Sequence, residues 1–214
     1  MENVQRSWKR CLCQGRIPLR KNSAVAVYFA AAFRERCPSQ QVRFVQCYYY
    51  EMLPESVEDV FMHFVGEDYI SGNFVKFNSN GGQTKMLEAA SDVAQAFSHY
   101  NYASSHGQMM VLDVQGVCQS SSNGHQLVLS DPQVLSVSQS FGPGDLGMAG
   151  MVCFFATHIC NDLCRNLDLT CALRRRVSFG SICLSCLERE PLWRELPLSA
   201  LGQHVERRTV NRGC

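Results

Sequence analysis

The chain has 214 residues, of which 46% are hydrophobic and 18% are charged, and its net charge is +1. This length and composition suit one sizeable folded domain or two small lobes, and they exclude a chain that is disordered throughout. The longest apolar run, residues 24–33, is about half of the roughly 20 residues that a membrane span requires, and no apolar signal segment opens the chain. We therefore expect a cytoplasmic protein without a membrane span.

The distribution of charges and of cysteines limits the kinds of partner and of covalent or metal site that we expect. Residues 1–22 carry six basic and one acidic residue, and residues 170–214 carry eight basic and four acidic residues. Because these basic ends are short and lack interleaved aromatic residues, we expect them to stay solvated and expect no nucleic-acid partner. The 12 cysteines are mostly scattered singly in apolar surroundings, which favours free thiols and a metal site over a disulfide framework.

The first predicted helix covers residues 24–36, whose small and apolar residues are followed by Cys37-Pro38. Three strand-like segments come next, at residues 41–52, 59–68 and 72–78, each rich in β-branched and aromatic residues. Together they predict a small antiparallel sheet.

A second helix is predicted at residues 86–102, where apolar residues recur at the spacing of an amphipathic helix. Residues 108–117 then predict a buried strand, in which Asp113 and Gln115 interrupt the apolar run. An acid at this place must be paired or serve a purpose.

The remaining segments are a polar loop, a third helix and a tail. Residues 118–126 predict the loop, and residues 148–166 predict the helix, which follows a glycine-rich segment. The segment 170–214 lacks comparable periodicity, so we expect a flexible basic tail there.

A metal site is suggested by Cys160 and Cys164, because residues four apart lie on one face of a helix. His158 would lie about 200° away from Cys160 on an ideal helix, so it can join them only where the helix is distorted. A structural zinc site has four protein ligands, and His99 is the best-placed fourth candidate. The alternative is that the cysteines pack as small apolar groups.

A second candidate site consists of Asp113, Gln115 and Asp131. Asp113 and Gln115 are two residues apart, so on a strand both point to one face. Oxygen ligands on one face, with another acid nearby, suit Mg²⁺. The alternative is a buried acid whose hydrogen bonds are satisfied.

The two candidate metal sites and the glycine-rich segment are weak signals one by one, but they occur within six segments that follow one another in a characteristic order. These segments are "EDYISGNFVKFNSN", "QAFSHYNY", "VLDVQGV", "LSDPQV", "FGPGDLGMAGM" and "FFATHICNDLCRNLDL". Residues 67–169, which contain them, resemble the catalytic region of the alpha-kinases, the atypical protein kinases that include elongation factor 2 kinase and myosin heavy chain kinase. The resemblance implies an α+β, two-lobed atypical kinase fold with a truncated N-lobe and a zinc-stabilised C-lobe. It implies ATP, Mg²⁺ and structural Zn²⁺ as cofactors, and a protein substrate that is phosphorylated on Ser or Thr.

The resemblance also implies roles for individual residues. His99, His158, Cys160 and Cys164 would hold the zinc ion. Asp113 would be the catalytic aspartate, with Lys76 and Asn80 lining the active site and Gln115 and Asp131 coordinating Mg²⁺. Glu67, Asp68 and Tyr69 would meet the adenine through backbone hydrogen bonds. The glycines Gly142, Gly144, Gly147 and Gly150 would form a substrate-side loop, since they lack the context of a nucleotide-binding glycine motif.

The same resemblance divides the chain into four parts. Residues 1–22 are a basic segment, residues 23–66 are a remnant of the N-lobe, residues 67–169 are the catalytic core, and residues 170–214 are the tail.

The chain departs from the family pattern in its N-lobe and near the magnesium ligands. Val25 stands where a glutamate would pair with the ATP-binding lysine, and no lysine occurs near Gln5, where that residue is expected. Lys9 and Lys21 are nearby but lack a strand-like context. Cys118 replaces a glycine before the polar loop.

Three functions remain open: an active alpha-kinase, a pseudokinase that acts as a zinc-stabilised binding module, and a zinc-dependent nucleic-acid binder. Two short motifs are weaker signals. The pair Cys183 and Cys186 has metal-like spacing, and "RRRVSF" makes Ser178 a possible target of basic-directed kinases. The protein substrate and the oligomeric state are not predicted.

Overall fold

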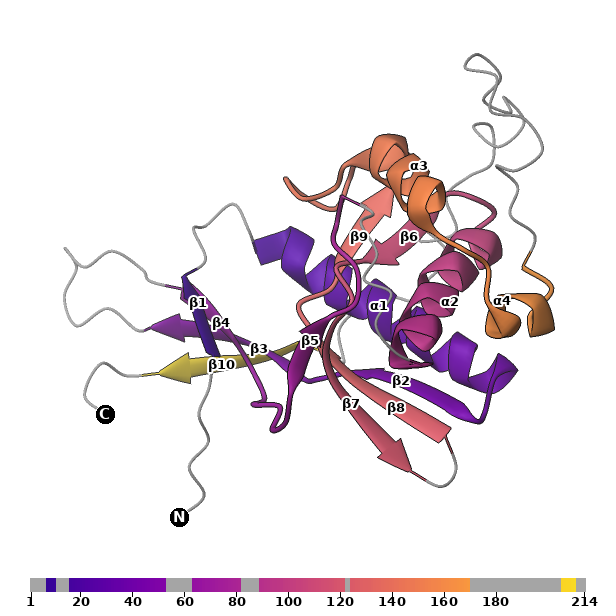
Figure 1. Ribbon diagram of the computed structural model, residues 1–214. Coiled ribbons are helices and arrows are strands. Elements are labelled where there is room, and N and C mark those ends of the chain that lie inside the picture. The colour runs from indigo at the N-terminus through magenta and orange to yellow at the C-terminus, as the bar shows by residue number, and fades with distance from the viewer. Residues whose placement is uncertain are drawn as a thin grey trace.

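The computed structural model describes residues 7–10, 16–52, 63–81, 89–121, 124–169 and 205–210 (Figure 1). Its helices are α1 (Arg16–Arg36), α2 (Ala89–Ser104), α3 (Gly147–Thr157) and α4 (Asp162–Asn166). Its strands are β1 (Ser7–Arg10), β2 (Gln40–Phe44), β3 (Cys47–Met52), β4 (His63–Glu67), β5 (Phe74–Lys76), β6 (Met109–Leu112), β7 (Gln115–Ser121), β8 (Gly124–Ser130), β9 (Gln133–Ser136) and β10 (Val205–Val210).

The described strands form three sheets. The first sheet has the order β1-β4-β3-β10, the second has the order β2-β8-β7-β5, and β6 pairs with β9 alone. β10 and β3 are parallel, as are β2 and β8, whereas the other pairs are antiparallel. In Figure 1 the first sheet lies on the left, the second sheet lies below, and the β6–β9 pair lies above it.

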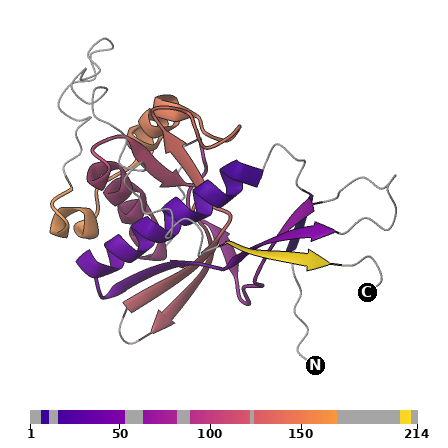
Figure 2. The same ribbon diagram turned by 180° about the vertical axis from the view of Figure 1, so that it is seen from behind.

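The main core lies between α1, α2 and the second sheet. Figure 2 shows α1 as a long helix lying across the back of the molecule. Phe33 of α1 meets Phe97 of α2 edge to face, with ring centroids 5.6 Å apart, and Phe97 also contacts Phe44 of β2. Offset and edge-to-face arrangements favour such aromatic contacts beyond the burial of area. These contacts fix α2 against the second sheet.

One segment predicted as a single strand is divided between two sheets. Residues 41–52, predicted as one strand, form β2 of the second sheet and β3 of the first. The predicted small antiparallel sheet is therefore wrong, because residues 45–46 carry the chain from one sheet to the other. α1 also begins earlier than residue 24; it includes Pro18 in its first turn, where a missing N–H is tolerated.

Four further predictions differ from the structure. The single strand predicted at residues 108–117 is divided into β6 and β7, which belong to different sheets, because the left-handed backbone of Asp113 turns the chain between them. The polar residues 118–126 are not a loop but belong largely to β7 and β8, because cross-strand pairing does not require apolar side chains. The helix predicted at residues 148–166 is divided into α3 and α4 by residues 158–161. Within the predicted tail, residues 205–210 form β10, since the edge of β3 offers unpaired backbone groups to any extended segment.

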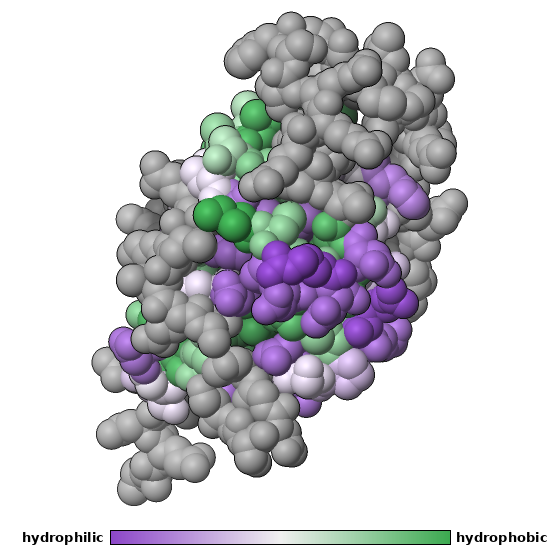
Figure 3. All heavy atoms as spheres, turned by 45° about the vertical axis from the view of Figure 1, so that its right-hand side comes forward, coloured by the Kyte–Doolittle hydropathy of each residue, from purple (hydrophilic) through white to green (hydrophobic). Residues whose placement is uncertain are grey.

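Other sequence motifs lie outside the described residues, namely the Cys183–Cys186 pair and Ser178. None of the helices in the described residues combines the length and the hydropathy that a membrane span requires. Figure 3 shows hydrophilic residues gathered across the middle of the face that it draws.

Gly116 provides a test of the second sheet. Its φ is +154°, and a Cβ there would lie 2.1 Å from the carbonyl oxygen of Val128 on the neighbouring strand. We expect Gly116→Ala to lower the free energy of unfolding by about 2 kcal/mol or more, because both the backbone and β8 would have to move. Gly81→Ala is the matched control, since its nearest neighbour would be the Ser79 hydroxyl at 3.8 Å. Chemical denaturation measures both; equal stabilities would contradict the prediction.

Candidate active site and metal cluster

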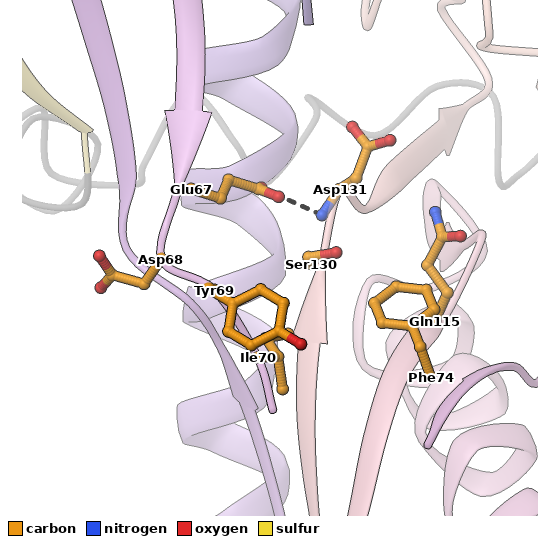
Figure 4. Close-up of a pocket in the computed structure, with 8 residues that line it drawn as sticks. All are labelled: Glu67, Asp68, Tyr69, Ile70, Phe74, Gln115, Ser130 and Asp131. Carbon is orange, nitrogen blue, oxygen red and sulfur yellow. Dashed lines mark hydrogen bonds between the residues drawn. The ribbon is translucent and has the colours of Figure 1, made fainter. Parts of the chain in front are cut away.

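A cavity of about 340 Å³ opens where the first and second sheets meet. Its walls come from the end of β4 and the residues after it, from β5, from the start of β7 and from the end of β8 (Figure 4). The lining residues are Glu67, Asp68, Tyr69, Ile70, Phe74, Gln115, Ser130 and Asp131. Five of them were predicted as nucleotide or magnesium ligands, whereas Ile70, Phe74 and Ser130 were not.

The segment after β4 is tied to both sheets. The carboxylate of Glu67 accepts a hydrogen bond from the backbone N–H of Asp131 at 3.1 Å, which links the first sheet to the end of β8 (Figure 4). Asp68 accepts a bond from the Tyr48 hydroxyl at 3.4 Å. Tyr69 and Phe74 are 57% and 51% exposed, so the cavity has aromatic surfaces open to a ligand.

Asp113 lies beside this cavity at the end of β6. Its φ of +58° is in the left-handed region, which is uncommon for a residue other than glycine. One carboxylate oxygen lies 2.5 Å from Nζ of Lys76, and the other accepts a hydrogen bond of 3.2 Å from the side-chain amide of Gln115. The structure thus brings together three of the predicted site residues.

Asp131 lies close to Gln115 because β7 and β8 are paired. The register places Gln115 opposite Ser130, and Asp131 is the next residue. Asp131 is also left-handed, with φ of +50°. The amide oxygen and the carboxylate are the kinds of ligand that Mg²⁺ takes beside water and phosphate, so the donor set fits that ion.

Two asparagines near Lys76 have different positions. Asn80, predicted to line the active site, is not among the cavity residues; its side chain donates to the carbonyl of Gly144 at 3.3 Å. Asn78, which the sequence did not single out, is 1% exposed and its amide oxygen accepts the backbone N–H of Val114 at 2.9 Å. The sequence signal that could have drawn attention to Asn78 is its place as a polar residue directly after the strand-like "FVKF".

The glycine-rich loop joins β9 to α3. Buried Asp145 organises it, accepting backbone hydrogen bonds from Ser136, Phe141 and Gly147 and a bond from the Ser136 hydroxyl at 2.7 Å. Gly142 and Gly147 have positive φ values of 94° and 60°, and Gly147 and Gly150 lie in the first turn of α3. Through Asn80 this loop is joined to the segment after β5.

The four predicted metal ligands form one cluster. The candidate ligand atoms of His99, His158, Cys160 and Cys164 all lie within 4.8 Å of one another. The sulfur of Cys160 is 3.8 Å from Nδ1 of His99, and the sulfur of Cys164 is 3.6 Å from Nε2 of His158. A tetrahedral zinc ion with ordinary bond lengths would hold nitrogen and sulfur ligands about 3.6 Å apart. The residues therefore fit a zinc ion.

The break between α3 and α4 allows this arrangement. His158 has extended backbone geometry at the end of α3, and Asn161 caps α4 by accepting the N–H of Cys164 at 3.0 Å. Asn161 also donates to the carbonyl of Asp92 on α2 at 2.8 Å. The distortion that the sequence required for His158 to join the cysteines is thus confirmed.

Burial sets the protonation of the cluster. It lowers the pKa of His158 to about 4, and the neighbouring His99 adds to the shift, so His158 is neutral at pH 7. It raises the pKa of Cys164 to about 12, against the opposing hydrogen bond from the backbone of the capped turn. A divalent cation among these ligands would favour the thiolate and take the place of the proton.

Comparison with known proteins agrees with this geometry. The sequence profile of the alpha-kinase family matches residues 19–164. The chain belongs to the alpha-kinase family. Among alpha-kinases, it is 35% identical over 146 residues to eukaryotic elongation factor 2 kinase of Caenorhabditis elegans, which is 68% of this chain and 17% of that relative. It is 30% identical over 150 residues to myosin heavy chain kinase B of Dictyostelium discoideum, covering 70% of this chain and 19% of the relative.

Solved alpha-kinase structures share the fold. The alpha-kinase domain of myosin heavy chain kinase A in complex with ADP matches with a TM-score of 0.66 and 30% identity, over 77% of this chain and 62% of that domain. The same domain in complex with AMP-PNP matches with a TM-score of 0.63 and 28% identity, over 76% and 59%. This chain therefore spans a minor part of the curated relatives and less than two thirds of the crystallised domain.

Proposed function

We propose that this chain is the catalytic core of an atypical protein kinase, which transfers the γ-phosphoryl group of ATP to Ser or Thr of a protein substrate. The observation that carries the proposal is that one cavity is lined by Glu67–Tyr69, Gln115 and Asp131, and that the Lys76–Asp113 pair is joined to this cavity by the hydrogen bond from Gln115. Solved alpha-kinase domains that hold ADP and AMP-PNP support it.

In this proposal the cavity walls hold the nucleotide. The Glu67–Tyr69 segment meets the adenine through its backbone, and the exposed rings of Tyr69 and Phe74 offer apolar contact. Gln115 and Asp131 hold a magnesium ion, which would neutralise phosphate charge.

Asp113 acts on the substrate hydroxyl. Its carboxylate is oriented by Lys76 at 2.5 Å and by Gln115 at 3.2 Å, so it can receive the proton of an incoming Ser or Thr hydroxyl at a fixed place. Phosphoryl transfer depends mainly on positioning and charge neutralisation, which this set of groups can provide.

Lys9 is our candidate for the ATP-binding lysine, which the sequence analysis did not find near Gln5. It lies on β1, paired with Val65 of β4, whereas the sequence had suggested no strand there. Residues two apart on a strand share a face, so the register places Lys9 on the face of the first sheet that carries Glu67. We propose that Lys9 serves the nucleotide phosphates.

The cluster of His99, His158, Cys160 and Cys164 is proposed to hold structural zinc. It would bind α2 to the turn between α3 and α4, and its four protein ligands leave no open position for catalysis. We propose a cytoplasmic location, because thiolate ligands such as Cys160 and Cys164 suit a reducing compartment.

A binding module without transferase activity is the alternative. It is favoured by Val25, which is 1% exposed in the core and cannot replace the glutamate expected to pair with a lysine. The retained Lys76–Asp113 pair favours the kinase, since a binding module has no need of it.

The first test is phosphate transfer. We expect the purified chain with Mg·ATP to label a threonine-containing peptide, or itself, and Asp113→Ala to lower the rate by about 100-fold or more. Glu35→Ala, an exposed change on α1, is the control that should retain the rate. A folded parent that transfers no phosphate would indicate a pseudokinase or a fragment.

Lys9 is tested in the same assay. We expect Lys9→Ala to raise the KM for ATP about tenfold or more, because the charge that this proposal assigns to phosphate binding is removed. Arg10→Ala removes an equal charge from the next position of β1 and should leave the KM unchanged. Equal effects of the two substitutions would show that general charge, not this position, matters.

The metal is tested by composition and stability. We expect one zinc per chain by elemental analysis, and a lower Tm after chelation, because the energy of metal binding contributes to folding. Cys164→Ser should lose the zinc, while Cys153→Ser, which changes an exposed cysteine of α3 outside the cluster, should keep it. Zinc retained by Cys164→Ser at full occupancy would contradict the assignment.

A further inference from the structure

A buried polar network lies behind Asp113, where α2 packs against β6. Its members are Asn78, Gln95 and Ser98, and each is exposed by 2% or less. The Asn78 amide nitrogen donates to the Ser98 hydroxyl at 3.1 Å and to the Gln95 amide oxygen at 3.4 Å. Buried polar groups cost stability unless they are hydrogen-bonded, and such fully connected groups fix one arrangement of the core.

The network holds the backbone on both sides of Asp113. On the C-terminal side, the amide oxygen of Asn78 accepts the N–H of Val114 at 2.9 Å. On the N-terminal side, the Ser98 hydroxyl donates to the carbonyl of Val111 at 2.8 Å.

Gln95, the third member of the network, holds the segment that follows Lys76. Gln95 donates to the carbonyl of Phe77 at 3.1 Å, and the N–H of Phe77 donates to the carbonyl of Val114 at 2.9 Å. The side chains of α2 therefore hold both the chain that carries Asp113 and the segment that follows Lys76.

Asp113 needs such support because its backbone is strained. A left-handed backbone is unfavourable for a residue other than glycine, and it persists only where the surroundings determine it. The hydrogen bonds to Val111, two residues before Asp113, and to Val114, the next residue, hold the backbone of the turn from which the Asp113 side chain extends.

We propose that Asn78 and Ser98 are positioning residues for phosphoryl transfer, acting through the backbone turn at Asp113. The inference rests on the proposed kinase function and extends it to residues that do not touch the cavity. A displacement of about 1 Å at a reacting group costs about 100-fold in rate, so loosening this turn should be felt in kcat.

Ser105 supplies a matched control. It is 1% exposed, and its hydroxyl donates to the carbonyl of Met109 at 2.8 Å and accepts the N–H of Met109 at 3.0 Å. Ser98→Ala and Ser105→Ala therefore remove the same group from the same kind of bond to β6. They differ in that Met109 is at the end of β6 remote from Asp113.

The experiment compares Asn78→Ala, Ser98→Ala and Ser105→Ala in the zinc-loaded chain. We expect Asn78→Ala and Ser98→Ala to lower kcat by about 10- to 100-fold while the KM for ATP changes by about twofold or less. Ser105→Ala should retain kcat after correction for the folded fraction. Hydrogen exchange should be faster at the Val114 amide in Asn78→Ala and unchanged there in Ser105→Ala.

The outcomes distinguish a failure of this positioning role from a failure of the kinase proposal. If Asn78→Ala does not fold, Ser98→Ala, which removes one oxygen, decides alone. An active parent whose Ser98→Ala variant keeps kcat, or an equal loss of kcat in Ser105→Ala, overturns this inference and leaves the kinase proposal standing. A folded, zinc-loaded parent that transfers no phosphate overturns the kinase proposal and this inference with it.

Discussion

The left-handed turn at Asp113 is the constraint on which the candidate active site depends. Asp113 follows β6, which pairs with β9, and only Val114 separates it from β7, which pairs with β5 and β8. The chain therefore changes sheets within two residues. An ordinary extended residue would continue the line of β6, and Gln115 would then not pair with Lys76. The φ of +58° is what joins the two sheets at this point.

The chain returns from the second sheet to the β6–β9 pair through a second left-handed aspartate. β8 ends at Ser130, Asp131 has a φ of +50°, and β9 then pairs with β6. The hairpin of β7 and β8 thus leaves the β6–β9 pair through one left-handed aspartate and returns through another. The antiparallel register of that hairpin places both crossings at the same end, which explains why carboxylates 18 positions apart in the sequence flank one site. Glu67 then secures the second crossing from the first sheet.

Sequence reasoning found the parts of this site whose chemistry is local. Asp113 and Gln115 are two residues apart and Cys160 and Cys164 are four apart, so each pair was found from its short spacing. The reason given for the first pair, a shared strand face, is wrong, because Asp113 is the left-handed residue that ends β6 and Gln115 begins β7 in another sheet; their side chains meet through a hydrogen bond across that turn. The sequence could not show that residues 45–46 carry the chain between two sheets, or that polar residues 118–126 pair as strands, because both depend on partners distant in the chain. Asn78 was missed for the same reason: its role is defined by Gln95 and Ser98 on α2, not by its neighbours in sequence.

Helix α2 connects the two candidate sites through adjacent residues. Ser98 contacts the backbone beside Asp113, while His99, one residue later and about 100° around the helix, faces the cysteines and His158. The helix is therefore fixed on one side by the polar network and on the other by the ligand cluster. A rotation of α2 that relieved one set of contacts would break the other, since both sets lie within one turn. An ion bound by the cluster would thus restrain the serine that holds the catalytic turn, which gives a structural zinc site a physical reason to lie behind the active site and not at the surface.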